Sequence, residues 1–265
     1  MPKYSIALLG LIFLFSFIAP FFYQTSPLSL DPSSILLPPS FEHFFGTDRL
    51  GRDLLARVMQ GGRVSLGIGV GSALIASFIG FIMGSLAGYF KGNVDKTFVV
   101  VVDLFLTFPT FFLLLAMVSY VNASVFVLIA IISFTGWMTT ARLIRSESFA
   151  ITSKPFVKIL NIARVSKTKI LLKYYAPLLA PIFFVSFTFG VGGAILAESG
   201  LSFLGLGIVP PQMSWGSIMS EGKELIEIAW WVSFFPGIMI FFVTFSLINI
   251  SNYLQSITNK KELQL

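Results

Sequence analysis

Residues 64–90 read VSLGIGVGSALIASFIGFIMGSLAGYF, an apolar run without a charged side chain between Arg63 and Lys91. A helix needs roughly 20 mostly apolar residues to cross the hydrocarbon of a bilayer, so this run predicts a membrane span. A stripe of small residues recurs at every fourth position of the run: Ser72, Ala76, Gly80, Gly84 and Gly88. Small residues let helices approach closely in lipid, so the stripe predicts a tightly packed helix pair.

The composition extends this interpretation to the whole chain. Of the 265 residues, 55% are hydrophobic and 11% are charged, and the mean hydropathy is +0.88. A soluble domain carries about 25% charged residues, so we expect an all-α membrane protein. The chain has no cysteine and one histidine, His43, which leaves little material for a catalytic, metal or cofactor site, and we expect none. The net charge of +6 is spread between apolar runs, which indicates membrane topology rather than nucleic-acid binding.

Further apolar runs bring the expected number of spans to about six. The first, residues 4–23, is expected to be a retained anchor because no small-residue cleavage site follows it. Residues 97–141 are too long for one crossing and predict a helical hairpin that breaks near residues 122–124. The last two spans are expected near residues 178–197 and 228–255. We expect an N-terminal part, residues 1–62, and a core of five spans, residues 63–265.

The distribution of Lys and Arg predicts the orientation. If the N-terminus is cytoplasmic, 13 of the 18 basic residues lie in cytoplasmic segments. This bias favours cytoplasmic locations for both termini. The 13 are Lys3, Lys91, Lys96, Arg142, Arg145, Lys154, Lys158, Arg164, Lys167, Lys169, Lys173, Lys260 and Lys261.

The outer segment between the first two spans ends in FGTDRLGRD, residues 45–53. Thr47 or Asp48 is expected to cap a short amphipathic helix in the outer interface, with ion pairs from Asp53 to Arg49 and Arg57. A surface helix with a purely architectural role is the alternative. His43 is expected to be a loop residue. The residues that define this motif are Gly46, Thr47, Asp48, Gly51, Arg52 and Asp53.

Two carboxylates fall within predicted spans. Asp103 is a functional candidate because a buried carboxylate is costly in a membrane, but it is also near enough to the inner interface to pair with a local Lys or Arg. Glu198, followed by Ser199 and Ser202, either faces a transport path or pairs with an arginine such as Arg63. The tryptophans at the outer end are expected in the interfacial belt: Trp215, Trp230 and Trp231.

The inner segment, residues 142–177, is long and basic. Arg142 and Arg145 are expected to close the fourth span, and a short helix with apolar side chains is expected to follow. Its apolar face predicts docking on a soluble partner or on the ends of the other helices, and adsorption to anionic lipid is the alternative.

Together these stretches resemble one family, the inner-membrane permease subunits of dipeptide, oligopeptide and nickel ABC importers, and in particular the second permease of each pair. The resemblance covers nearly the whole chain and is carried by residues 43–53, by Glu198 to Gly207 with Pro210, Pro211 and Ser214–Gly216, and by the inner segment. It implies the importer permease fold and a multi-pass location in the bacterial inner membrane.

In this family the inner segment carries a Glu-Ala-Ala-x3-Gly pattern, with Leu-Pro further on, on a helix that docks in a groove of the ATPase. Here the spacing and Pro177 remain, but Lys158, Ile159, Leu160 and Arg164 occupy the Glu, Ala, Ala and Gly positions. The residues that the resemblance places in this coupling loop are Arg142, Arg145, Phe156, Val157, Lys158, Ile159, Leu160, Arg164 and Pro177.

The resemblance implies one half of a translocation path for peptides, nickel or a nickel chelate. The implied partners are a second homologous permease, two cytoplasmic ATPase subunits and an extracytoplasmic binding protein. The chain has no phosphate-binding loop of the Gly-x4-Gly-Lys-Ser/Thr type, so we expect a non-catalytic subunit. A stand-alone channel or secondary carrier is the alternative, and an intramembrane enzyme is a more remote one.

Overall fold

The computed structural model describes the backbone of residues 2–262 and the side chains of residues 2–258. Within these residues it consists of helices and loops, with one isolated β-bridge between Thr47 and Asp53. The predicted all-α class is confirmed. Lys260 and Lys261, which contribute to the charge bias, lie outside the described side chains.

Five helical segments are long and apolar enough to cross a membrane, and a bent helix pair makes up to six. The predicted number of about six is confirmed. In chain order the helices are α1 (Lys3–Phe13, continued by π and 3-10 turns to Phe21), α2 (Leu54–Phe90), α3 (Gly92–Thr107), α4 (Thr110–Val118), α5 (Val125–Thr152), α6 (Pro155–Ile162), α7 (Lys167–Ile170, continued by a π turn, Leu171–Tyr175), α8 (Ala176–Phe203), α9 (Trp215–Gly222) and α10 (Trp231–Glu262).

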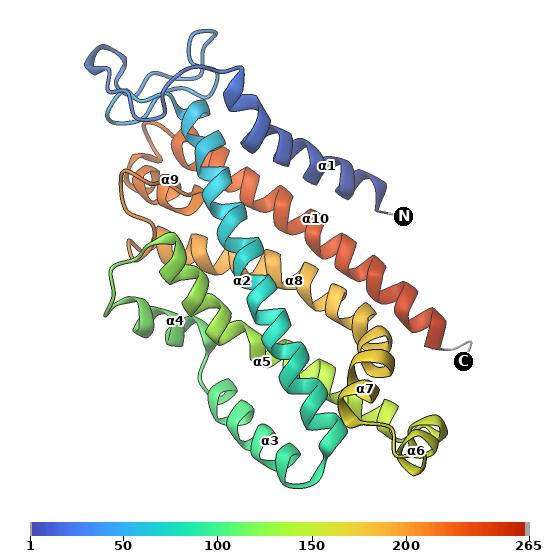
Figure 1. The fold of residues 1–265 in the computed structure, drawn as a ribbon. Helices are drawn as coiled ribbons and strands as arrows, with labels where there is room; N and C mark the ends of the chain where they lie inside the picture. The colour runs from blue at the N-terminus through green and yellow to red at the C-terminus, as the bar shows by residue number, and fades with distance from the viewer. Residues whose placement is uncertain (1, 263–265) are drawn as a thin grey trace.

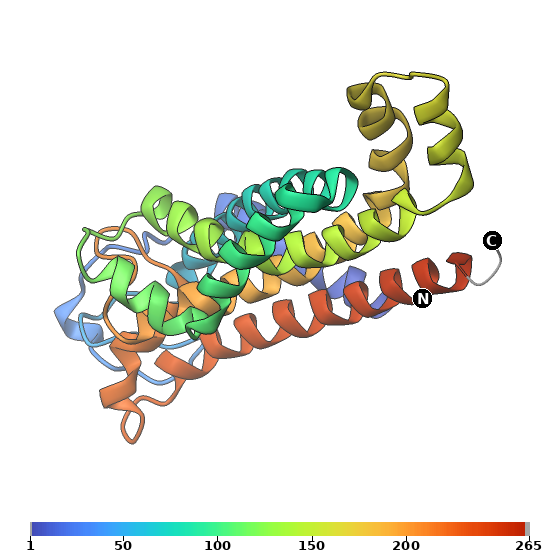
Figure 2. The ribbon, with the colours of Figure 1, turned by 90° about the horizontal axis from the view of Figure 1, so that it is seen from below.

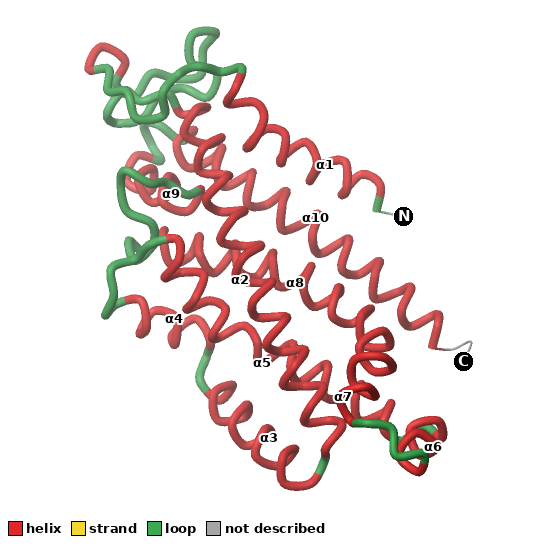
Figure 3. The backbone as a smooth tube through the Cα atoms, in the orientation of Figure 1, coloured by secondary structure: helices red, strands yellow, loops and turns green. Residues whose placement is uncertain are grey.

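The bundle has two distinct ends (Figure 1). Residues 22–53 and 204–230 form one of them, here called the cap end, where most of the loop gathers (Figure 3). The other, here called the terminal end, holds the first residues of α1 and the last of α10. Helices α6 and α7 also lie there and project sideways from the bundle (Figure 2).

Helix α2 corrects the prediction for the outer segment. No separate interfacial helix precedes the span, because α2 is continuous from Leu54 to Phe90. Its 37 residues extend about 55 Å, against about 30 Å of hydrocarbon, so the helix passes well beyond the apolar layer. The expected boundary between residues 62 and 63 falls inside this helix.

The hairpin over residues 97–141 breaks where expected, and Ser124 caps the start of α5 by accepting a hydrogen bond from the backbone nitrogen of Val127. A second break, which was not predicted, divides its first arm at Phe108 and Pro109. The residue before a proline is driven out of the helical region, and Phe108 is accordingly extended (ψ 134°). The two halves, α3 and α4, meet at 78°.

Helix α5 continues past the predicted end of the fourth span. It runs to Thr152, so Arg142 and Arg145 lie inside the helix rather than at its end. The short helix expected in the inner segment is α6, which begins with Pro155 at its first position.

The stripe of small residues on α2 packs against α5. A Cβ atom added at Gly80 would lie 2.8 Å from the carbonyl oxygen of Trp137, and one at Gly84 would lie 2.9 Å from the backbone nitrogen of Arg145. Across the same contact the hydroxyl of Ser148 donates to the carbonyl of Ser85 at 3.1 Å. The glycines of α2 therefore lie directly against the backbone and the Cβ atoms of α5.

We predict that Gly80→Ala lowers the stability of the solubilised protein by about 1–3 kcal/mol, because the new methyl group meets backbone atoms that cannot yield. Gly67→Ala on the same helix is the matched control, since a Cβ there has no neighbour within 4 Å. Thermal unfolding in one detergent would compare the two. Equal midpoints for both variants would contradict the close contact.

Candidate functional site

The motif of residues 45–53 forms a tight turn at the start of α2. Gly46 and Gly51 adopt φ values of +77° and +71°, a region that side chains disfavour. A Cβ at Gly46 would lie 2.7 Å from the carbonyl oxygen of Leu37 and from the indole nitrogen of Trp231. The glycines of this motif thus allow the turn to pack against Leu37 and against Trp231 at the start of α10.

This turn places a buried ion network at the cap end. Both guanidinium groups of Arg52 and Arg57 contact the carboxylates of Asp48 and Glu221. Arg57 donates from Nη1 and Nη2 to the two oxygens of Glu221 at 2.7 and 2.8 Å, a bidentate pair. The side chains of Arg57 and Asp48 are 2% and 1% exposed. The network ties the start of α2 to α9, and its formal charges cancel.

The predicted cap and ion pairs of this segment are wrong. Asp53, not Thr47 or Asp48, caps the helix by accepting from the backbone nitrogen of Ala56 at 2.9 Å. Its second oxygen lies 3.0 Å from Nδ1 of His43 and accepts from the Tyr23 hydroxyl at 3.0 Å. Burial, together with the Asp53 carboxylate, raises the pKa of Tyr23. Asp53 therefore has partners from the preceding loop, and His43 is a loop residue as predicted.

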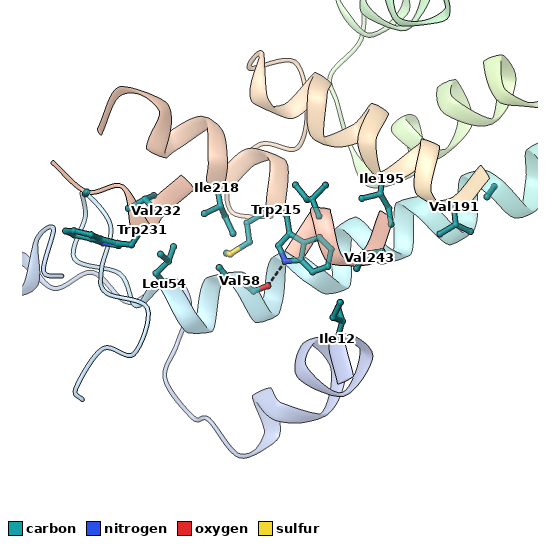
Figure 4. Packing of buried hydrophobic residues seen from close by; sticks show 14 residues of the cluster. Ile12, Leu54, Val58, Val191, Ile195, Trp215, Ile218, Trp231, Val232 and Val243 are labelled. Carbon is teal, nitrogen blue, oxygen red and sulfur yellow. Dashed lines mark hydrogen bonds between the residues drawn. The ribbon is translucent and has the colours of Figure 1, made fainter. Parts of the chain in front are cut away.

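The prediction of an interfacial tryptophan belt is wrong for two of its three members. Trp215 is fully buried and donates from its indole nitrogen to the carbonyl of Val58 at 2.9 Å (Figure 4). Trp231 is 6% exposed and donates to the carbonyl of Thr47 at 3.0 Å. Trp230 is exposed. The two buried indoles each satisfy their single donor on backbone near the start of α2, which locks the cap onto the bundle.

Glu198 lies in a cluster of hydroxyl groups between α2, α8 and α9. It is fully buried and accepts hydrogen bonds from Ser202 at 2.7 Å, Ser65 at 3.1 Å and Ser199 at 3.5 Å. Ser65 in turn accepts from the backbone nitrogen of Trp215 at 3.1 Å. The carboxylate thus joins three helices.

Arg63, the suggested partner of Glu198, instead links α1 to α2. It donates to the carbonyl of Ser16 at 2.9 Å and to that of Phe17 at 3.3 Å. Both acceptors lie in the π-helical turn Leu14–Ile18, where regular helical hydrogen bonding is interrupted. The suggested pairing of Glu198 with Arg63 is therefore wrong, and hydroxyl groups take the place of the arginine.

Asp103 has the local partner that the sequence allowed. Its carboxylate accepts from Nη2 of Arg142 at 2.5 Å, and both side chains are more than half exposed. About two helical turns closer to the terminal end on α3, Asp95 forms a bidentate pair with Arg145, with Nη2 to Oδ2 at 2.7 Å. These two pairs fasten α3 to α5.

Helix α6 exposes an apolar and basic surface at the terminal end. Ile159 and Ile162 are 64% and 82% exposed, whereas Val157 is buried against the bundle. The sequence has no acidic residue between Glu147 and Glu198. The cations around α6 are Lys154, Lys158, Arg164, Lys167, Lys169 and Lys173.

The remaining members of the predicted coupling loop lie close to this surface. Phe156 and Leu160 are half-buried and pack with Val157 in one core cluster, and Arg164 takes a positive φ of 53° just after the helix. Pro177 lies in the first turn of α8. The structure thus brings Phe156, Val157 and Leu160 together on α6, whereas Arg142 and Arg145 bind α3 and Pro177 lies on α8.

A groove of about 400 Å³ opens along the bundle between α2, α4, α5, α8 and α10. It is lined by small residues and by hydroxyl and carboxamide side chains, and the first two members of the α2 stripe, Ser72 and Ala76, lie on its wall. Polar side chains facing lipid are costly, so this face is expected to meet protein or water.

Sequence reasoning missed two features. Glu221 was not singled out, because nothing local to it shows that two arginines from the start of α2 reach it. The groove was also missed, although Thr135, Thr139 and Thr140 recur at helical spacing on α5 and were a usable signal. Among the described residues, no group of three His, Cys, Asp or Glu side chains is placed to hold a metal ion.

We predict that Arg57→Met destabilises the protein by about 3–5 kcal/mol, because it leaves the buried Asp48 and the partly buried Glu221 without their shared cation. Arg49→Met is the control: Arg49 is exposed, and no ion pair to it is found in the described part of the chain. Thermal unfolding in detergent at constant pH would measure both. A control as unstable as the Arg57 variant would contradict the network.

Comparison with known proteins agrees with this architecture. A family model described as "binding-protein-dependent transport system inner membrane component" matches residues 76–261. The oligopeptide transport system permease protein OppC of Haemophilus influenzae is 32% identical over 97% of this chain and 84% of its own length. OppC of Mycobacterium bovis is 34% identical over 88% of this chain and 81% of its own length.

The dipeptide transport system permease protein DppC of Alkalihalophilus pseudofirmus is 33% identical over 92% of this chain and 82% of its own length. These matches extend over the apolar helices, the cap and the inner segment alike. The chain therefore belongs to the family of inner membrane components of binding-protein-dependent transport systems, and it is a multi-pass permease subunit of an ABC importer.

Proposed function

We propose that this chain forms half of the translocation path of a peptide importer. The relatives named above are oligopeptide and dipeptide permeases, which supports peptides as the cargo. Nickel or a nickel chelate remains the alternative cargo from the sequence resemblance. The other half of the path would come from a second, homologous permease.

Energy for transport would come from two ATPase subunits bound at the terminal end, which we propose is cytoplasmic. The excess of Lys and Arg at this end supports the orientation. A binding protein would deliver the peptide to the opposite, cap end. The rigid cap fits that role, because a docking surface that is already ordered loses little conformational entropy on binding.

The projecting helix α6 is the observation that carries this proposal. Large apolar side chains of α6, which projects from the bundle, are exposed and uncovered by any of the described residues. Helix α6 follows α5 in the chain and is joined to α8 through α7. A displacement of α6 would therefore be transmitted to two of the five helices that line the groove. An ATPase that moves on binding ATP could change the groove by this connection.

The proposal is tested by isolating the complex. Affinity purification of this chain from gently solubilised membranes should recover a second permease and ATPase subunits, identified by mass spectrometry. Recovery of the chain alone, under conditions that preserve a known importer, would instead favour a stand-alone channel or carrier.

We predict that Ile159→Asp with Ile162→Asp lowers ATP-dependent peptide uptake at least tenfold, because a charge at each apolar contact is desolvated when α6 docks. The same positions changed to Leu form the control and should keep uptake near that of the unmodified protein. Membrane level is monitored by immunoblotting. Full uptake by the Asp variant at normal level would refute the docking role of α6.

A further inference from the structure

The groove between α2, α4, α5, α8 and α10 has an unusual lining for a membrane protein. It contains hydroxyl groups, two carboxamides and both small and large apolar residues, and none of the described residues that line it is Asp, Glu, Lys, Arg or His. Asn252 and Gln255 are exposed towards one end of the groove, and Thr139 is exposed on α5. The groove is therefore mostly apolar, with neutral hydrogen-bonding groups set into its wall, and it carries no formal charge.

Most hydroxyl groups elsewhere in these helices already have a partner. Thr188 donates to the carbonyl of Phe184, and Thr244 donates to that of Ile240. In the groove Thr135 and Ser251 also donate to backbone carbonyls, but the side chains of Thr139, Asn252 and Gln255 make no hydrogen bond within the described part of the protein. Their hydrogen-bonding capacity is available to a molecule that enters the groove.

Two buried hydroxyl groups on the groove wall are also unpartnered. Ser72 on α2 is 0% exposed and Ser186 on α8 is 8% exposed, and neither hydroxyl oxygen has a hydrogen-bond partner among the described residues. A buried polar group without a partner is unfavourable, so a ligand or water that bonds to it after a side-chain rotation is stabilised. The two serines stand on different helices that both line the groove.

We propose that this groove binds the main-chain amide groups of a peptide in transit, through neutral hydrogen bonds and without regard to the charge of the peptide's side chains. This inference rests on the proposed function. Each peptide residue other than proline offers one N–H donor and one C=O acceptor. Hydroxyl and carboxamide side chains can both donate and accept, so they match either group.

The absence of formal charge from the lining explains how one path can serve varied sequences. A fixed carboxylate or ammonium in the groove would repel peptides of like charge and retain those of opposite charge. A path must bind its cargo weakly enough to release it. Neutral hydrogen bonds to the main chain fulfil both conditions.

The first experiment introduces one charge into the groove. Asn252→Asp keeps the shape of the side chain, and Asn122→Asp in the exposed loop before α5 is the matched control. Uptake of three tripeptides that differ only in a central Glu, Ala or Lys is measured for each complex. Each rate is divided by that of the unmodified complex with the same binding protein, so that the selectivity of the binding protein cancels.

We expect Asn252→Asp to lower the relative uptake of the Glu peptide at least tenfold below that of the Lys peptide, while Asn122→Asp leaves the three ratios equal. Thr139→Asp should give the same bias if Asn252→Asp does not assemble. Equal ratios for the three peptides in an active groove variant would overturn the inference. Loss of the second permease from both groove variants would also overturn it, because the groove would then be a packing interface.

The second experiment removes the buried hydroxyls. Ser72→Ala and Ser186→Ala should each lower peptide uptake several-fold, and Ser85→Ala and Ser246→Ala are matched controls. All four hydroxyls are buried and unpartnered among the described residues, but only the first two residues line the groove. Four variants with the same uptake would overturn the inference. Absence of ATP-dependent peptide uptake in the unmodified complex would instead refute the proposed function itself.

Discussion

The close contact of α2 with α5 is the constraint on which the rest of the bundle depends. Lipid supplies no hydrophobic drive between helices, so close van der Waals contact has to hold them together. Gly80, Gly84 and Gly88 leave no side chain at three positions of α2, which brings its backbone against the backbone and the Cβ atoms of α5. The ion pairs of Arg142 and Arg145 then attach α3 to the same α5, and α8 packs beside both helices. The groove is the space that this arrangement leaves open.

The two ends of the bundle differ because their polar groups are satisfied in different ways. At the cap end, Arg57, Asp48 and Glu221 neutralise one another, and the indoles of Trp215 and Trp231 bond to backbone carbonyls. At the terminal end, the cations around α6 remain exposed and without acidic neighbours in sequence. A closed cap and an open basic surface suit a subunit that receives cargo at one end and energy at the other.

The sequence predicted the features that depend on local pattern. Apolar runs located the helices, because about 20 consecutive residues must share one environment to cross lipid. The stripe from Ser72 to Gly88 indicated a close helix contact for the same local reason. The errors concern groups whose partners are remote: Arg57 was paired with Asp53 four residues away, whereas it binds Glu221, 164 residues away. Ion pairs at i,i+4 contribute a few tenths of a kcal/mol, so a buried bidentate contact readily displaces them.

The separation of Arg57 from Glu221 also has a consequence for biogenesis. Arg52, Arg57 and Asp48 emerge early during synthesis, and at that stage the ion network holds two cations and one anion. The fourth member reaches it only when α9 has crossed to the same side of the membrane, since Glu221 lies near the end of that helix. The charges of this network are therefore balanced only once Glu221 has been added to the chain. A nascent or truncated polypeptide without Glu221 keeps one arginine of the network without its carboxylate. An incomplete molecule therefore differs from a complete one in its net charge at this site.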